Sequence, residues 1–200
     1  MRFLSSAIVV VSLLAVALPP IAAADPISKG SRMIGGTFSF SSSGGDLYEI
    51  NNKRVTRLQM NPSLNVFVFD RFSLGGVLAI DRTSSDAATS MGFGIGPRIA
   101  YFFGQTGSTG VPGSVYPYIG FAILYTRQTY DPSGIASDLT ISGYSFGFGC
   151  GLISMLSNEI GLSFELTYQI DSATVEYGGF EDSESGDSVN LTAGIACFLY

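Results

Sequence analysis

The stretch Met91-Gly-Phe-Gly-Ile-Gly-Pro-Arg-Ile-Ala-Tyr-Phe-Phe103 alternates between two unlike sets of side chains. The odd-numbered positions are large and apolar apart from Pro97, whereas the even-numbered positions are mostly small, with Arg98 among them. A repeat of two residues is typical of an extended strand whose two faces meet different surroundings. The stretch therefore predicts a β-strand with one apolar face.

The same alternation recurs along the chain and predicts eight strands. They cover residues 31–41, 55–69, 72–82, 89–103, 114–129, 138–155, 159–176 and 188–200. No segment after residue 25 has a helical period, so no helix is available to cover the apolar faces. Strands alone satisfy their backbone hydrogen bonds in lipid if the sheet closes on itself. The sequence therefore predicts an all-β fold, a closed eight-stranded antiparallel up-and-down transmembrane β-barrel, as one domain over residues 25–200.

The predicted outward faces carry no charge. They comprise Ile34, Phe38 and Phe40; Leu58, Met60, Pro62, Leu64, Val66 and Val68; Ile119, Phe121, Ile123 and Tyr125; Tyr144, Phe146, Phe148, Cys150 and Leu152; and Ile160, Leu162, Phe164, Leu166, Tyr168 and Ile170. An arginine or lysine at the lipid midplane would cost roughly 2–4 kcal/mol. Pro62 and Pro97 each remove a ladder hydrogen bond in mid-strand, so we predict a β-bulge at both positions.

Residues 1–24 are expected to be a signal peptide. Arg2 precedes an apolar run over residues 7–18, and three alanines at 22–24 offer a cleavage site. The run is shorter than the roughly 20 residues that a membrane-spanning helix needs, and an uncleaved anchor is the alternative. Cys150 and Cys197 are expected to be free thiols. One strand lies between theirs, and two strand spacings of about 4.8 Å exceed disulfide reach.

The predicted connections between strands are unequal in length. Asp70-Arg71 and residues 156–158 form tight turns, whereas residues 42–54, 83–88, 130–137 and 177–187 form longer polar loops. Short periplasmic turns and longer extracellular loops are typical of bacterial outer-membrane barrels. Residues 104–113 depart from this pattern, because they are long for a periplasmic turn.

Several segments resemble small outer-membrane barrel proteins in their order and spacing. They are residues 58–70 leading into 72–76, residues 94–103, residues 116–120, and the terminal Phe198-Leu-Tyr200. On these residues the mature chain resembles the eight-stranded outer-membrane β-barrel family of the OmpA, OmpX and OmpW type. The resemblance implies the outer membrane of a Gram-negative bacterium, and a C-terminal strand read by the barrel assembly machinery. It does not fix a function, because proteins of one fold differ in function.

The facing of the last strand is open at this point. Polarity places Asn190, Thr192 and Gly194 in the lumen. The family resemblance implies instead that the terminal aromatics, Phe198 and Tyr200, face lipid. A bulge near Gly194 would satisfy both expectations.

Arg98 and Glu165 are expected at one depth inside the barrel, because each lies about five or six residues above the same end of its strand. An eight-stranded barrel is just wide enough to be filled by its own side chains, so the two would form a buried ion pair. The expected hydrogen-bond partners of the pair are Gln59, Asn61, Tyr118 and Thr167. The pair either ties the lumen together or acts as a gate whose breaking opens a narrow path.

Phe67, Phe69 and Phe102 are expected to face inward near the periplasmic mouth as an aromatic floor. The glycines above them either make room for side chains of the opposite wall or leave a small outward-open cavity for an apolar ligand. A wide aqueous pore is not expected on either interpretation.

The composition argues against catalysis. The chain has no histidine, so a serine or water nucleophile would lack its usual proton acceptor near neutral pH. Glu165 and Asp171 lie on one strand about 20 Å apart, too far for a catalytic carboxylate pair. We therefore assign no catalytic residue, cofactor or metal ligand. The net charge of −6 disfavours a nucleic-acid partner, which needs a basic surface.

Basic residues near the outer rim are candidates for contact with lipopolysaccharide phosphates, which arginine and lysine bind well. They are Lys53, Arg54, Arg57, Arg82 and Arg127. The acidic 177–187 segment is expected to be a solvated loop rather than a cation site. We expect a non-enzymatic outer-membrane protein with a structural or surface-interaction role, whose loops meet an extracellular or host partner. The alternatives are a narrow channel or binder for small apolar molecules, and a secreted soluble ligand-binding β-barrel.

Overall fold

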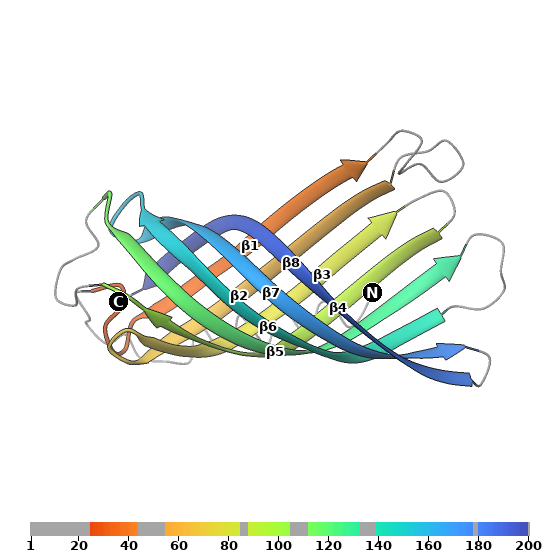
Figure 1. Cartoon of the computed structure of the whole chain (residues 1–200). Coiled ribbons are helices and arrows are strands. Elements are labelled where there is room, and N and C mark those ends of the chain that lie inside the picture. The colour runs from red at the N-terminus through yellow and green to blue at the C-terminus, as the bar shows by residue number, and fades with distance from the viewer. Residues whose placement is uncertain are drawn as a thin grey trace.

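A computed structural model of the chain is a closed barrel of eight antiparallel strands, in which each strand pairs with the next and β8 pairs with β1 (Figure 1). The strands are β1 (Arg32–Ser43), β2 (Val55–Phe69), β3 (Phe72–Ser84), β4 (Ala88–Phe102), β5 (Val115–Pro132), β6 (Leu139–Met155), β7 (Ile160–Tyr177) and β8 (Phe180–Leu199). The structure describes residues 25–43, 55–84, 88–104, 112–132, 139–177 and 180–199. The predicted fold class is confirmed. The predicted signal peptide lies outside the described residues.

The barrel has two unlike ends (Figure 1). At one, the turn end, β1 begins, β8 ends, and short connections over residues 70–71 and 156–159 join β2 to β3 and β6 to β7. Arg71 in the first of these takes a φ of 68°, the left-handed conformation that a sharp reversal requires. The other, the loop end, carries the connections after β1, β3, β5 and β7. Across the described ranges, no helix is long and apolar enough to span a membrane.

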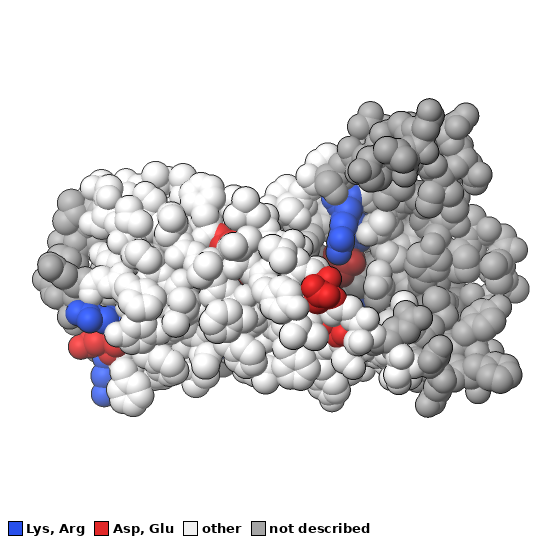
Figure 2. All heavy atoms as spheres, viewed as in Figure 1, with Lys and Arg blue, Asp and Glu red and all other residues white. Residues whose placement is uncertain are grey.

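Side chains along the described strands alternate between the outer surface and the lumen. The outward faces predicted from the sequence are confirmed, and large apolar side chains are exposed on every strand. In Figure 2 most of the described surface carries no Lys, Arg, Asp or Glu atoms; the charged atoms form a few small groups, one of them at the turn end. Such an uncharged belt is suited to lipid.

The predicted bulges at Pro62 and Pro97 are wrong. Beside each proline the ladder with one neighbouring strand is interrupted over equal stretches of both strands, so the register is the same before and after. The missing proline N–H removes a hydrogen bond without adding a residue. The β2–β3 register shifts instead between Phe67 and Phe69, at the turn end of β2. This shift reverses the facing of Phe69.

The last hairpin is longer than predicted. Most of the segment 177–187, expected to be a loop, belongs to strands, because β7 continues to Tyr177 and β8 begins at Phe180. Tyr177 and Phe180 form the last pair of a ladder that runs without a shift from Ile160↔Cys197. Above the apolar belt a strand can be polar on both faces, because water surrounds it. Polarity alone therefore did not exclude strand structure.

Strand β8 alternates without interruption down to Leu199. Its pairings with β7 and with β1 are continuous, so the bulge considered near Gly194 is absent from the described strand. Asn190, Thr192 and Gly194 face the lumen, as polarity predicted. Phe198 also faces inward and is fully buried, contrary to the facing that the family resemblance implied. Both cysteines are free, as expected.

One seam of the barrel is closed over only part of its length. β1 pairs with β8 from Arg32↔Leu199 to Phe38↔Ala193, whereas β7 and β8 stay paired up to the loop end. Beyond Phe38 the two strands diverge (Figure 1). The exposed fraction of Leu191, beside this seam, is 77%, the highest among the large apolar residues described. The open part of the seam begins at the depth of Glu165, which pairs with Thr192.

Candidate functional site in the barrel lumen

An ion pair crosses the lumen between opposite walls. Nη2 of Arg98, on β4, lies 2.6 Å from Oε2 of Glu165, on β7. Tyr118 on β5 donates its hydroxyl hydrogen bond to the same oxygen at 2.6 Å, and Thr167 donates to Oε1 at 3.2 Å. The Arg98 guanidinium carbon also lies 5.9 Å from the centre of the Tyr118 ring. Because the two charged side chains are only 15% and 12% exposed, their interaction is weakly screened by water.

Glycines on the intervening strands make room for this pair. A Cβ atom at Gly149 would lie 2.9 Å from Oε1 of Glu165, and one at Gly151 would lie 2.6 Å from the Tyr118 ring. At Gly120 the nearest contact with Arg98, to its Nη2, would be 3.6 Å. The glycine-rich inward faces of β5 and β6 therefore position the charged side chains of β4 and β7.

The expected partners divide into two groups. Tyr118 and Thr167 contact Glu165 directly. Asn61 instead donates to Oγ1 of Thr37 at 3.2 Å, and Gln59 lines the lumen without a hydrogen bond to the pair. Both amides lie on β2, away from the β4, β5 and β7 walls that form the network. Their expected role as direct partners of the ion pair is therefore wrong.

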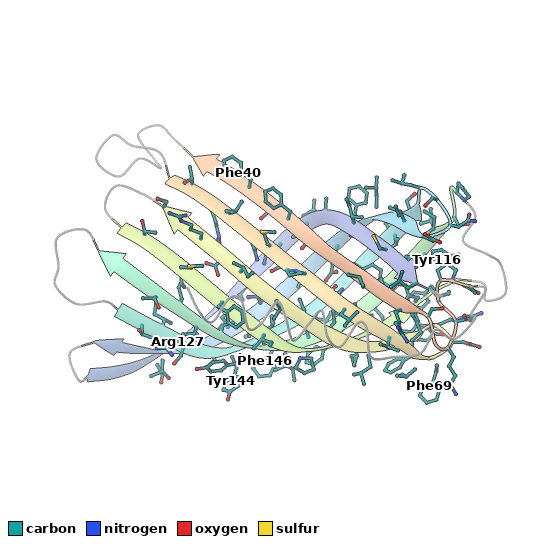
Figure 3. The ribbon with its side chains drawn as sticks, turned by 180° about the vertical axis from the view of Figure 1, so that it is seen from behind. Phe40, Phe69, Tyr116, Arg127, Tyr144 and Phe146 are labelled. Atoms are coloured by element: carbon teal, nitrogen blue, oxygen red, sulfur yellow. The ribbon has the colours of Figure 1, made fainter. Side chains whose placement is uncertain are left out.

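An apolar floor closes the lumen at the turn end. It comprises Ile27, Met33, Phe67, Ala100, Phe102, Tyr116, Tyr118, Ile153, Met155, Ala196 and Phe198, all buried. The ring centres of Phe67 and Phe102, and those of Phe102 and Tyr118, are 5.2 Å apart. Phe69, which was expected here, is 65% exposed and points away from the barrel, because the register shift turns it outward (Figure 3).

The segment preceding β1 seals this floor from outside. Ile27 is fully buried among the floor residues, and its carbonyl accepts a hydrogen bond from the Arg71 amide at 2.7 Å. Gly30 donates to the Phe67 carbonyl at 2.8 Å, and the Lys29 amide donates to the Asp70 carboxylate at 2.8 Å. This segment was not predicted from the sequence. Its one signal is an isolated isoleucine in a short polar stretch.

Above the floor the lumen contains a cavity of about 560 Å³. It extends from Met33 and Ile153, at the top of the floor, past the ion pair and toward the loop end. Its polar lining residues include Arg57, Gln59, Asn61, Asp81, Gln128, Gln169, Asp171 and Asn190. The ion pair spans the cavity without filling it, so the glycines do leave open space.

The basic residues assigned to the rim lie in three different places. Arg57 faces inward and lines the cavity near Asp81, so its expected contact with lipopolysaccharide is wrong. Arg82 and Arg127 are exposed on the outer surface of β3 and β5. Lys53 and Arg54 lie outside the described residues.

Comparisons with known proteins identify the fold. No family model and no curated protein sequence matches the chain. The solved outer membrane protein OprG from Pseudomonas aeruginosa is similar, with a TM-score of 0.54, 14% identity, and 86% of this chain and 97% of that chain covered. The N-terminal β-barrel domain of Pseudomonas aeruginosa OprF is similar with a TM-score of 0.52 and 15% identity, and the match covers 86% of this chain and 98% of that domain. The outer membrane protein AlkL, solved in lipid bilayers, has a TM-score of 0.53 and 14% identity, and the match covers 91% of this chain and 95% of that chain. The chain thus has the fold of the small eight-stranded outer-membrane barrels.

Proposed function

We propose that the chain is a non-enzymatic protein of a Gram-negative outer membrane, in which a plugged barrel anchors an extracellular interaction surface. The turn end then faces the periplasm and the loop end faces outside, as the lengths of the connections favour. The loops and the projecting strand ends form the working surface toward an extracellular or host partner. The barrel assembly machinery would engage β8 during insertion.

The observation that carries this proposal is the apolar floor. Phe67, Phe102 and Phe198 are each no more than 1% exposed, and Ile27 covers them from the turn end. A buried, mainly apolar layer offers water few polar partners, so it opposes a conducting path. The ion pair is then a structural tie, because the floor below it remains closed whether or not the pair forms.

Single-channel recording in planar bilayers tests the proposal. The refolded mature barrel is expected to insert without a steady current, and Glu165→Ala is expected to behave likewise. Asp187→Asn, at an exposed site on β8, removes the same charge outside the lumen and serves as the control. Steady openings in the unmodified barrel would contradict the plugged anchor. Openings seen only with Glu165→Ala would favour the gate.

A second candidate function is binding of a small molecule in the cavity. The cavity of about 560 Å³ and the partly open β1–β8 seam favour it. Amide and carboxylate groups such as Gln128 and Asp171 favour a polar ligand over the apolar one expected from the sequence. Solution NMR of the barrel in detergent micelles, titrated with small polar and apolar compounds, tests this candidate. Chemical-shift changes confined to the backbone amides of lumen-lining residues such as Gly94 and Gly147 would support binding. Unchanged chemical shifts at these residues would exclude it for those compounds.

A further inference from the structure

Arg82 and Arg127 are two cations exposed on one side of the barrel. Neither has an ion-pair or hydrogen-bond partner among the residues that the structure describes. Both are exposed, on β3 and β5, with only β4 between them. By contrast, Arg57 faces the lumen and Arg98 is bound to Glu165. Both side chains are therefore on the outer surface, on the side from which a lipid could approach.

Both arginines lie just beyond the apolar belt. Arg127 comes two residues after Tyr125, whose ring meets that of Tyr144 edge-on with centres 5.7 Å apart. Figure 3 shows Arg127 on the loop side of Tyr144 and Phe146. Aromatic side chains of this kind mark the membrane–water interface, and lipid headgroups lie immediately above them.

The spacing of the arginines is set by strand pairing. Arg82 lies opposite Met91 on β4, and Arg127 lies opposite Phe93 on the same strand. Two strand spacings and an offset of two residues separate their Cα atoms by about 12 Å. Met91 and Phe93 are exposed between them and continue into the apolar surface below. The site thus combines two guanidinium groups, each able to bind a phosphate, with an apolar strip beneath them.

The opposite side of the barrel differs. At the corresponding depth the outward residues of β6, β7 and β8 are Ser142, Ser172 and Asp187. None of these is a cation, and Asp187 would repel a phosphate. The basic site is therefore confined to the β3–β5 side within the described strands.

We propose that Arg82 and Arg127 bind the two phosphates of a bisphosphorylated glycolipid of the lipid A type. Its acyl chains lie against the apolar strip that begins at Phe93. Two separated phosphates above several acyl chains match two separated arginines above an apolar surface, and arginine binds each phosphate through paired hydrogen bonds. The inference rests on the outer-membrane location under Proposed function.

The test compares the double variant Arg82→Gln/Arg127→Gln with Arg57→Gln, which removes a cation from the lumen. Each protein is refolded into phosphatidylcholine vesicles containing bisphosphoryl lipid A, monophosphoryl lipid A or phosphatidylglycerol at matched charge. The lipid retained per barrel after detergent extraction and gel filtration is measured. The unmodified barrel and Arg57→Gln should retain bisphosphoryl lipid A preferentially. The double variant should retain at least about tenfold less, because it loses a charge-assisted contact to each of the two phosphates.

Three results would overturn the proposal: equal retention of bisphosphoryl lipid A by the double variant, loss of retention in Arg57→Gln, or equal retention of phosphatidylglycerol. Protease protection of the vesicle-bound protein distinguishes failure of the lipid A site from failure of the proposed membrane location. A double variant that is protected but no longer retains lipid A supports the site. An unmodified barrel that protease degrades in every vesicle would refute the membrane location as well.

Discussion

Replacing Glu165 by alanine should strongly destabilise the barrel. The change removes the carboxylate that Arg98 and Tyr118 both contact at 2.6 Å, and leaves the arginine buried without its partner. Breaking a buried pair in this way costs about 3–5 kcal/mol, because the remaining charge keeps its desolvation penalty. The free energy of unfolding, measured by urea titration of the barrel in lipid vesicles, should fall by that amount.

The matched variants separate the charge from the volume of the side chain. Arg98→Met/Glu165→Leu removes both charges and keeps similar bulk, so it should recover most of the stability lost in Glu165→Ala. Glu165→Gln keeps an acceptor for Tyr118, so its free energy of unfolding should lie between those of the two other variants. A loss below about 1 kcal/mol for Glu165→Ala would show that the pair behaves like a solvated surface salt bridge and is not a buried one.

Three further changes test the packing around the pair and the floor by the same unfolding measurement. Gly149→Ala places a Cβ atom 2.9 Å from the carboxylate of the pair and should cost about 1–3 kcal/mol, whereas Gly186→Ala, with nothing within 4 Å, should be nearly neutral. Equal effects would count against the glycine argument. Phe67→Ala should cost about 3–5 kcal/mol, and the outward Phe69→Ala should cost less than about 1 kcal/mol. The reverse order would show that the register shift is misplaced. Ile27→Ala should cost about 2–3 kcal/mol if the segment before β1 is packed as described, and no change would mean that it does not seal the floor.

The barrel itself could be predicted because each strand separates lipid from a narrow lumen. That separation imposes a repeat of two residues that survives from Ile34 to Ile170. The Arg98–Glu165 contact could be predicted for a related reason. Two opposite charges at one depth of a lumen just wide enough for side chains are close enough to pair.

The errors arose where the repeat carries no information. One register shift next to Phe69 reverses its facing, and no residue type marks that shift. The segment 177–187 is mostly polar, so its composition does not distinguish strand from loop. The seal formed by Ile27 and the partial opening between β1 and β8 depend on contacts between distant parts of the chain. Neither leaves a local pattern in the sequence.

The most direct test of the central claim is the accessibility of the lumen from its two ends. Gln169→Cys places a thiol in the cavity, and Met155→Cys places one in the floor, both with Cys150 and Cys197 replaced by alanine. Each protein in lipid vesicles is exposed to a membrane-impermeant maleimide on both sides of the bilayer. Rapid labelling is expected at position 169 and almost none at position 155. Comparable labelling at both positions would mean that water passes the floor, and would contradict a barrel plugged at the turn end.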